Sequence, residues 1–221
     1  MLRRLTWFLS ACALALVGCE EQPAAPAYGP DVVLVVDGLE IRRQEIERFH
    51  AIHASTAPEL GRRTIVRYLL ENHVLPLRYA QRAFAAKRAE LLEQARLLTT
   101  VAGNVVELEQ RCEPFFHQRK LVNRRQIEAP VAEFAFDRER LGAVSGPLEV
   151  PKGFVVAGCF DIQESAMVSE DLADLLQVGF LTHTNAEWVA WLRSEFERTA
   201  DKVSYVHPDY REALPFWLKL P

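Results

Sequence analysis

A run of five apolar residues, Val32–Val36, constrains the fold of this chain more than any other feature. Four of the five are valine, whose β-branched side chain favours strands, and the pair Asp37-Gly38 that follows suits a tight hairpin turn. Leu39–Ile41 then predicts a short return strand. A helix is expected from near Arg42, because apolar residues recur there at three-residue spacing: Ile46, Phe49 and Ile52.

The middle of the chain has the periodicity of helices. Residues 60–84 carry a wide apolar stripe, and Pro76 inside it should kink the helix because proline removes one backbone hydrogen bond. Residues 85–121 keep a helical pattern, which Gly103-Asn104 and Pro114 are expected to divide. A group of basic residues at its end is interpreted as a solvated helix face: Arg119, Lys120, Arg124 and Arg125.

The pattern changes at Pro130, where an apolar segment, Ala132–Phe136, is followed by several glycines and prolines. These residues punctuate the chain and predict short strands between them. The expected elements are strands at 145–150 and 154–161, helices from Ser169 to about Val178 and from Asn185, and a strand at Val203–Val206. The predicted fold class is therefore α+β and mainly helical.

The N-terminus carries the parts of a secretory signal. Arg3 and Arg4 precede the apolar stretch Leu5–Leu16, which is shorter than the roughly 20 residues of a comfortable membrane span. The run that ends it, Leu16-Val17-Gly18-Cys19, resembles the lipobox of bacterial lipoproteins. This resemblance implies cleavage before Cys19, acylation of Cys19 and a body tethered to a membrane on the periplasmic side, with Glu20 favouring the outer membrane. A plain signal peptide or a small membrane anchor is the alternative.

Charge and cysteine content restrict the partners and cofactors. Loss of residues 1–18 removes two arginines and no acid, so the net charge moves from −4 to −6, which argues against a nucleic-acid partner. Cys112 and Cys159 could form a disulfide in an oxidising compartment or remain two buried thiols. No cofactor is expected, and no metal site, since His50 and His53 have no further ligands at convincing spacing.

Three segments together resemble the periplasmic parvulin-type foldases, the peptidyl-prolyl isomerase and chaperone group that contains SurA and PrsA. Residues 32–41 with Glu45, followed by 65–83, resemble their opening hairpin and first helices. Residues 132–162 resemble the last third of a parvulin domain, with Gly142-Ala143-Val144-Ser145-Gly146-Pro147 and Gly153-Phe154-Val155-Val156 as the matching motifs. Residues 188–205 resemble the terminal helix and strand that complete a SurA-like N-terminal helical domain.

The departures from this family concern catalysis. Val155 stands after the aromatic Phe154, where an active parvulin normally carries a histidine, and no H-I-L or G-G-x-L-G motif occurs. The resemblance therefore implies a degenerate, truncated isomerase module at 129–164, inserted between the two parts of a chaperone-like helical domain, 32–128 and 165–221. A lipid signal at 1–18 and a linker at 19–31 precede it. The strand at 203–206 is then expected to pair with Val32–Val36.

The resulting hypothesis is a lipid-anchored folding factor for envelope proteins, with isomerase activity lost. Its partners would be unfolded or partly folded chains and, through Cys19, a membrane. The residues expected to contact such chains are Phe115, Phe116, Trp188 and Trp191, although aromatic side chains of this kind commonly pack in a core. The alternatives are an active peptidyl-prolyl isomerase and a non-catalytic assembly lipoprotein that binds one envelope partner.

Overall fold

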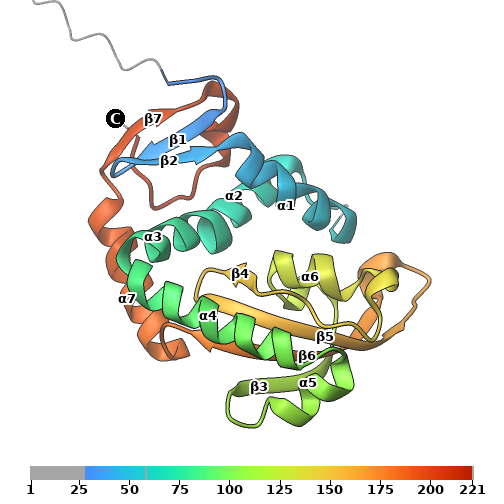
Figure 1. Cartoon of the computed structure of the whole chain (residues 1–221). Helices are drawn as coiled ribbons and strands as arrows, with labels where there is room; N and C mark the ends of the chain where they lie inside the picture. The colour runs from blue at the N-terminus through green and yellow to red at the C-terminus, as the bar shows by residue number, and fades with distance from the viewer. Residues whose placement is uncertain (1–27, 58, 221) are drawn as a thin grey trace, which may run out of the picture.

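The computed structural model describes residues 28–57 and 59–220. The predicted signal, Cys19 and most of the predicted linker lie outside the described residues. The described part contains helices and two antiparallel sheets of three and four strands, so the α+β class is confirmed (Figure 1). No described helix combines the length and the apolar character that a membrane crossing requires.

The smaller sheet joins the two ends of the folded chain. Its strand order is β2 (Leu39–Arg42), β1 (Val32–Val36) and β7 (Val203–Val206), with β1 in the centre. Val35 lies opposite Glu40 on one side and Tyr205 on the other. All five residues of β1 are buried. The predicted hairpin and the predicted pairing of the last strand with the first are therefore both confirmed.

Ion pairs around the hairpin turn reinforce this junction. Asp37 has a φ of 50° and Gly38 a φ of 75°, which is the left-handed conformation of a tight hairpin turn. The Asp37 carboxylate lies 2.7 Å from Arg82, 2.8 Å from Arg198 and 3.4 Å from Lys202. One carboxylate thus links the N-terminal hairpin, a central helix and the C-terminal part of the chain.

Helices pack against this sheet and form one hydrophobic core with it. They are α1 (Arg43–Thr56), α2 (Arg62–Leu69), α3 (Leu75–Ala83) and α7 (Asn185–Thr199). The core they share includes Val33, Ile46, Leu69 and Val203 from four separate segments. The capping residue of α7 is Thr184, whose hydroxyl accepts a hydrogen bond from the Glu187 backbone, and not Asn185 as expected from the sequence.

The disruption expected at Pro76 takes the form of a wider helical turn. Residues Leu70–Val74 form a π-helical segment, η1, between α2 and α3, and the Leu75 amide donates to the Leu70 carbonyl. A proline inside an α-helix removes one hydrogen bond and pushes against the carbonyl four residues earlier. The π turn relieves this conflict and places His73 in the interior, where it is 3% exposed.

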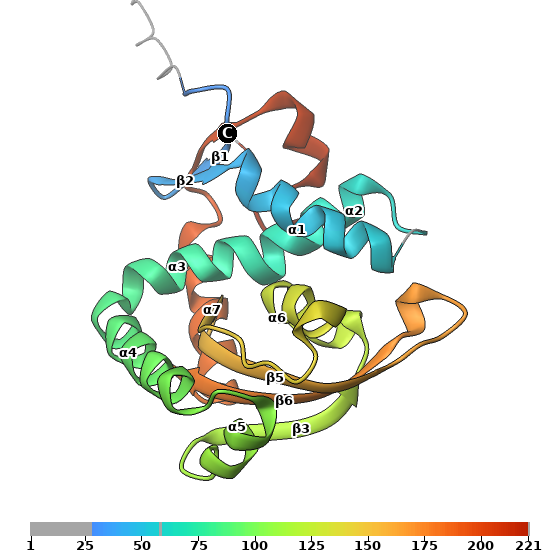
Figure 2. The same ribbon diagram turned by 45° about the vertical axis from the view of Figure 1, so that its right-hand side comes forward.

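The larger sheet has the strand order β3 (Phe116–Val122), β6 (Leu172–Leu181), β5 (Gly153–Gln163) and β4 (Leu148–Val150). Helix α6 (Ala129–Ala135) covers part of one face and lies between that face and helices α1–α3 (Figure 2). Helices α4 (Ala85–Val101) and α5 (Val105–Arg111) cover the other face. Short 3-10 turns complete the chain at η2 (Arg124–Gln126), η3 (Arg138–Arg140), η4 (Val168–Glu170) and η5 (Pro208–Ala213).

Two helices predicted from the sequence are strands in the structure. The expected helical stretch 85–121 is wrong at its end, because residues 116–122 form β3. Of the basic residues expected on a helix face, Arg119 and Lys120 lie on this edge strand, and Arg124 and Arg125 lie in the 3-10 turn η2. The expected helix at 169–178 is also wrong, because residues 172–181 form β6. Helices cover both faces of the middle of this strand, around Leu175 and Leu176, so its apolar residues form a nearly continuous run that does not alternate clearly. The sheet therefore extends beyond the module expected at 129–164.

The two cysteines do not form a disulfide. Both thiols are free and buried. Cys112 packs with the residues between the sheet and α4, whereas Cys159 packs on the opposite face under α6. Their sulfurs donate instead to local carbonyls of Glu109 and Asp161. The alternative of two buried thiols therefore holds, because the sheet itself separates them.

Candidate binding cleft

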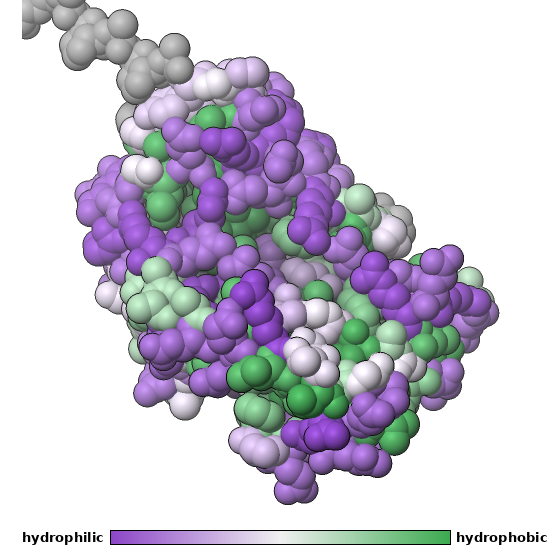
Figure 3. All heavy atoms as spheres, in the orientation of Figure 1, coloured by the Kyte–Doolittle hydropathy of each residue, from purple (hydrophilic) through white to green (hydrophobic). Residues whose placement is uncertain are grey.

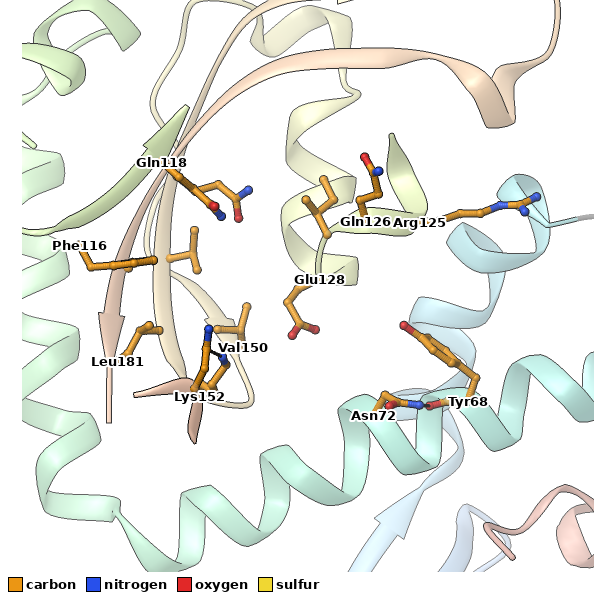
Figure 4. A pocket seen from close by; sticks show the side chains of 15 residues that line it. Tyr68, Asn72, Phe116, Gln118, Arg125, Gln126, Glu128, Val150, Lys152 and Leu181 are labelled. Carbon is orange, nitrogen blue, oxygen red and sulfur yellow. Dashed lines mark hydrogen bonds between the residues drawn. The ribbon is translucent and has the colours of Figure 1, made fainter. Parts of the chain in front are cut away.

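A cleft opens on the larger sheet where α6 ends. Along β6 the residues on this face change from buried, at Ala173 and Leu175, to partly exposed, at Gln177, Gly179 and Leu181. Their neighbours on the other face stay buried under α4. The cleft has a volume of about 470 Å³ and is lined by residues of the sheet, of α2–η1 and of the segment before α6. Figure 4 shows these three walls facing one another.

The floor of the cleft is partly apolar and partly amide. Val150, Val155, Leu181 and the ring of Phe116 supply apolar surface. Gln118 and Gln177 lie directly opposite each other on the paired strands β3 and β6. The Gln177 Nε2 atom is buried and has no hydrogen-bond partner among the described residues. A buried amide donor left without a partner is destabilising, and a ligand carbonyl in the cleft would satisfy it.

The opposite wall and the mouth carry further polar groups. Tyr68 and Asn72 both line the cleft (Figure 4), and Asn72 donates from Nδ2 to the backbone carbonyl of Tyr68 at 3.0 Å. Burial raises the pKa of Tyr68, and Glu128 raises it further, so the phenol stays a neutral hydrogen-bond donor near pH 7. On the sheet side, Lys152 donates to the Asn185 side chain.

Of the two residues at the expected isomerase position, only one lies on the cleft floor. Val155 is 8% exposed and lines the cleft, whereas Phe154 points to the other face of β5 and packs with the core under α4. The alternation of a strand explains the division. Among the described residues that line the cleft there is no histidine, cysteine or serine. The lining offers hydrogen bonds from amide groups and apolar contact, together with the charged side chains of Lys152 and Glu128.

The four aromatic residues expected to contact clients do not share one surface. Phe116 is 63% exposed and lines the cleft. Phe115 packs against Phe180 on the other face, with ring centroids 5.0 Å apart, and lines a groove of about 580 Å³ between α4 and α5. Trp188 is buried beside Trp191, at 4.9 Å, and lines a third groove on α7. The expected set therefore contributes one residue to the cleft.

The groove between α4 and α5 is more apolar than the cleft. It includes the exposed residues Leu97 and Val101. In Figure 3 the hydrophobic residues of the visible face gather over its lower half, where α4 and α5 lie. The walls of this groove are α4, the end of α5 and the turn at 113–115. Among its described lining residues there is neither an unsatisfied buried amide nor a strand edge.

Arg88 positions the cleft and was missed by the sequence analysis. Its side chain is 4% exposed and donates to the carbonyls of Pro151, at 2.9 Å, and Val150, at 3.2 Å, as well as to the Glu149 carboxylate at 2.9 Å. It thereby fixes the β4–β5 hairpin, which forms one side of the floor, to α4. Nothing in the spacing of residues around Arg88 distinguishes it from Arg96, the other arginine of that helix.

Gly153 fixes the same hairpin through its backbone. It has a φ of 150°, and a Cβ atom there would collide with the Phe180 carbonyl oxygen. The sequence Pro151-Lys152-Gly153 indicated this turn, although not the close approach of β6. Gly153 therefore allows β5 and β6 to pair at the end of the sheet where the cleft opens.

A histidine-rich interface lies beside the cleft. His73 approaches Glu128 Oε2 to 3.5 Å through Nδ1 and packs edge-on against Phe49 at 4.5 Å. Burial lowers the pKa of the neighbouring His53, and His73 and His50 lower it further. No group of three or more metal-ligating side chains occurs within residues 28–57 and 59–220. Through its two contacts, His73 packs η1 against Phe49 of α1 and against Glu128, the residue before α6.

Comparison with protein-family models, with curated proteins and with solved structures finds no match to this chain. The site must therefore be interpreted from its own geometry. That geometry is a cleft over a sheet, closed on one side by helices and open along an edge strand, with amide and apolar groups side by side.

Proposed function

We propose that this chain is a folding factor of the parvulin type that binds extended or unfolded segments of envelope proteins in this cleft, without isomerase catalysis. The body is proposed to be anchored to a membrane on the periplasmic side through an acylated Cys19. The observation that carries the binding proposal is the partly uncovered sheet face at Gln177 and Gly179, where the Gln177 amide is unsatisfied.

The chemistry of the lining suits a polypeptide. An extended chain presents one N–H and one C=O group per residue, together with side chains of varied size. The amides of Gln118, Gln177 and Asn72 can each both donate and accept hydrogen bonds, so they can pair with backbone groups whatever the sequence. The apolar floor contributes about 25 cal/mol for each Å² of apolar surface removed from water.

The same lining argues against rotation of a prolyl bond as the activity. The rotation barrier of an amide is about 18–20 kcal/mol and is somewhat lower before proline. Lowering it requires groups placed to stabilise the twisted bond, and the position proposed by resemblance for a histidine holds Val155. A bound chain would be held and released rather than converted.

Suppression of the aggregation of a chemically denatured client tests this proposal. The mature protein at several-fold molar excess is expected to reduce light scattering. Phe116→Ser should weaken the effect several-fold, because it removes an exposed apolar contact of the cleft at little risk to the core. Phe216→Ser is the matched control, since Phe216 is 84% exposed and lies outside the cleft lining.

Two results would contradict the binding part of the proposal. One is the absence of any effect of the wild-type protein on aggregation. The other is equal loss of the effect in both phenylalanine variants, which would place binding outside the cleft. Catalysis on a proline tetrapeptide above the uncatalysed rate would contradict the non-catalytic part and favour the isomerase alternative.

A further inference from the structure

One edge of the larger sheet, formed by β3, is free to pair with a further strand. β3 is an outer strand of seven residues, and all seven pair with β6 in one uninterrupted register. In an antiparallel pair, every second residue of an edge strand directs its N–H and C=O groups away from the partner. In the described part of the chain, the backbone of residues 116–122 is hydrogen-bonded only to β6. The outer backbone groups of β3 are therefore available to another strand.

This edge borders the cleft directly. Phe116 and Gln118 belong to β3 and also line the cleft. Lys120 and Val122 follow on the same face, because side chains on a strand alternate, and Val122 packs in the core under α6. A strand added outside β3 would widen the cleft floor, and its alternate side chains would stand beside Phe116 and Lys120.

The charges on β3 favour one kind of occupant. Arg119 is paired with Glu109 at 2.8 Å and with Asp174 at 2.6 Å, on the face away from the cleft. Lys120 is exposed, lies on the cleft face and has no ion pair among the described residues. Opposite charges directly across paired strands are favourable and like charges are unfavourable. Two copies of this chain meeting through β3 would bring His117, Arg119 and Lys120 of each copy together.

We propose that β3 accepts an extended segment of a client by β-strand addition, in the antiparallel direction, with a carboxylate opposite Lys120 and an apolar side chain opposite Phe116. The antiparallel direction follows the rest of the sheet and is slightly more stable per residue than the parallel one. The recognised segment then has an acidic residue followed four positions later by an apolar residue. This inference rests on the proposed function and specifies how the client is held.

Binding of labelled nine-residue peptides, followed by fluorescence anisotropy, tests the mode. The reference peptide is built from threonine and serine with a glutamate and, four positions later, a phenylalanine. Two derivatives carry N-methyl groups on alternate backbone amides, one on the odd and one on the even positions. Because only alternate residues of an added strand donate to the edge, one derivative should bind at least about tenfold more weakly and the other nearly unchanged.

Charge reversal tests the register, that is, whether the carboxylate lies opposite Lys120. Lys120→Glu should weaken the binding of the glutamate peptide about fivefold and strengthen the binding of a matched lysine peptide, because the attraction between the paired charges becomes a repulsion for the first peptide and the reverse for the second. Lys219→Glu, at another exposed lysine without an ion pair among the described residues, should change neither. Both side chains are exposed, so neither replacement disturbs a core.

Three outcomes would overturn the inference. Equal effects of the two methylation patterns would show that the backbone of the peptide does not pair with an edge. Equal effects of the two lysine variants on peptide binding would show that Lys120 does not contact the peptide. A concentration-dependent dimer of the wild type, seen by sedimentation and dissociated by the reference peptide, would assign the edge to a second copy of the chain. Each outcome leaves the aggregation result to decide the proposed function separately.

Discussion

Replacement of Asp37 by asparagine tests the junction between the two ends of the chain. Asparagine tolerates the left-handed backbone of this turn, so the change removes the charge and keeps the turn geometry. Asp37 contacts Arg82, Arg198 and Lys202, and its side chain is 19% exposed. Exposed ion pairs contribute about 0.2–1 kcal/mol each, so the loss of this network should lower the free energy of unfolding by about 1.5–2 kcal/mol.

The pH dependence supplies a second signature. Burial alone would raise the pKa of Asp37, but hydrogen bonds from Arg198 and Arg82 outweigh it and lower the pKa to about 2. A carboxyl with a lowered pKa stabilises the folded state above its unfolded pKa of about 3.9, and this contribution disappears as the pH falls towards 2. The difference in the free energy of unfolding between the wild type and Asp37→Asn should therefore reach its maximum at pH 7 and be close to zero at pH 2.

Thermal unfolding followed by circular dichroism provides the assay. In a chain of this size the expected loss corresponds to a decrease of about 3–8 °C in Tm. Asp201→Asn is the control, because it removes a nearby exposed carboxylate that has no ion pair among the described residues. The reasoning is refuted by a Tm of Asp37→Asn within about 1 °C of the wild type, or by an equal decrease in the control.

Three other replacements test the remaining parts of the account. Val35→Asp places a charge in the centre of the small sheet, where Val35 is 3% exposed, and should lower the free energy of unfolding by more than about 3 kcal/mol. Its control, Val189→Asp, lies at a position that is 60% exposed and should change the stability little. An unchanged urea midpoint for Val35→Asp would argue against the pairing of β1 with β7. Arg88→Met leaves the carbonyls of Val150 and Pro151 without their donor and should lower the free energy of unfolding by about 3–5 kcal/mol. Arg96→Met, on the exposed side of the same helix, is its control. Equal urea midpoints of the two variants would contradict the role given to Arg88. Cys19→Ala should yield a protein without the added mass of acyl chains and without membrane association on fractionation; membrane association that survives this change would remove Cys19 as the anchor.

The sequence predicted those parts of the fold that depend on local chemistry. The valines of β1 and the Asp37-Gly38 pair indicate the hairpin because β-branched residues and a left-handed turn are local properties. The pairing of β1 with β7 came from the resemblance, since no local signal places residue 205 beside residue 35. Pro76 indicated a disturbed helix, although not the π turn that accommodates it.

The larger sheet and the cleft were harder to predict for two physical reasons. β6 is covered on both faces, so Leu175 and Leu176 are both buried and the run resembles a buried helix. β3 is polar because it is an edge strand, and its exposed pattern resembles a solvated helix. The cleft combines residues that are distant in sequence, from Tyr68 to Asn185, so only the folded chain reveals Gln177 as an unsatisfied amide.

Site-specific photocrosslinking to an unfolded client tests most directly the claim that this cleft binds extended chains. A photoreactive phenylalanine derivative would replace Phe116 in one variant and Phe216 in another, since both positions are exposed and only the first lines the cleft. Strong crosslinks to a denatured client are expected from position 116 and few from position 216. Equal crosslinking from both positions, or none from position 116, would contradict this claim.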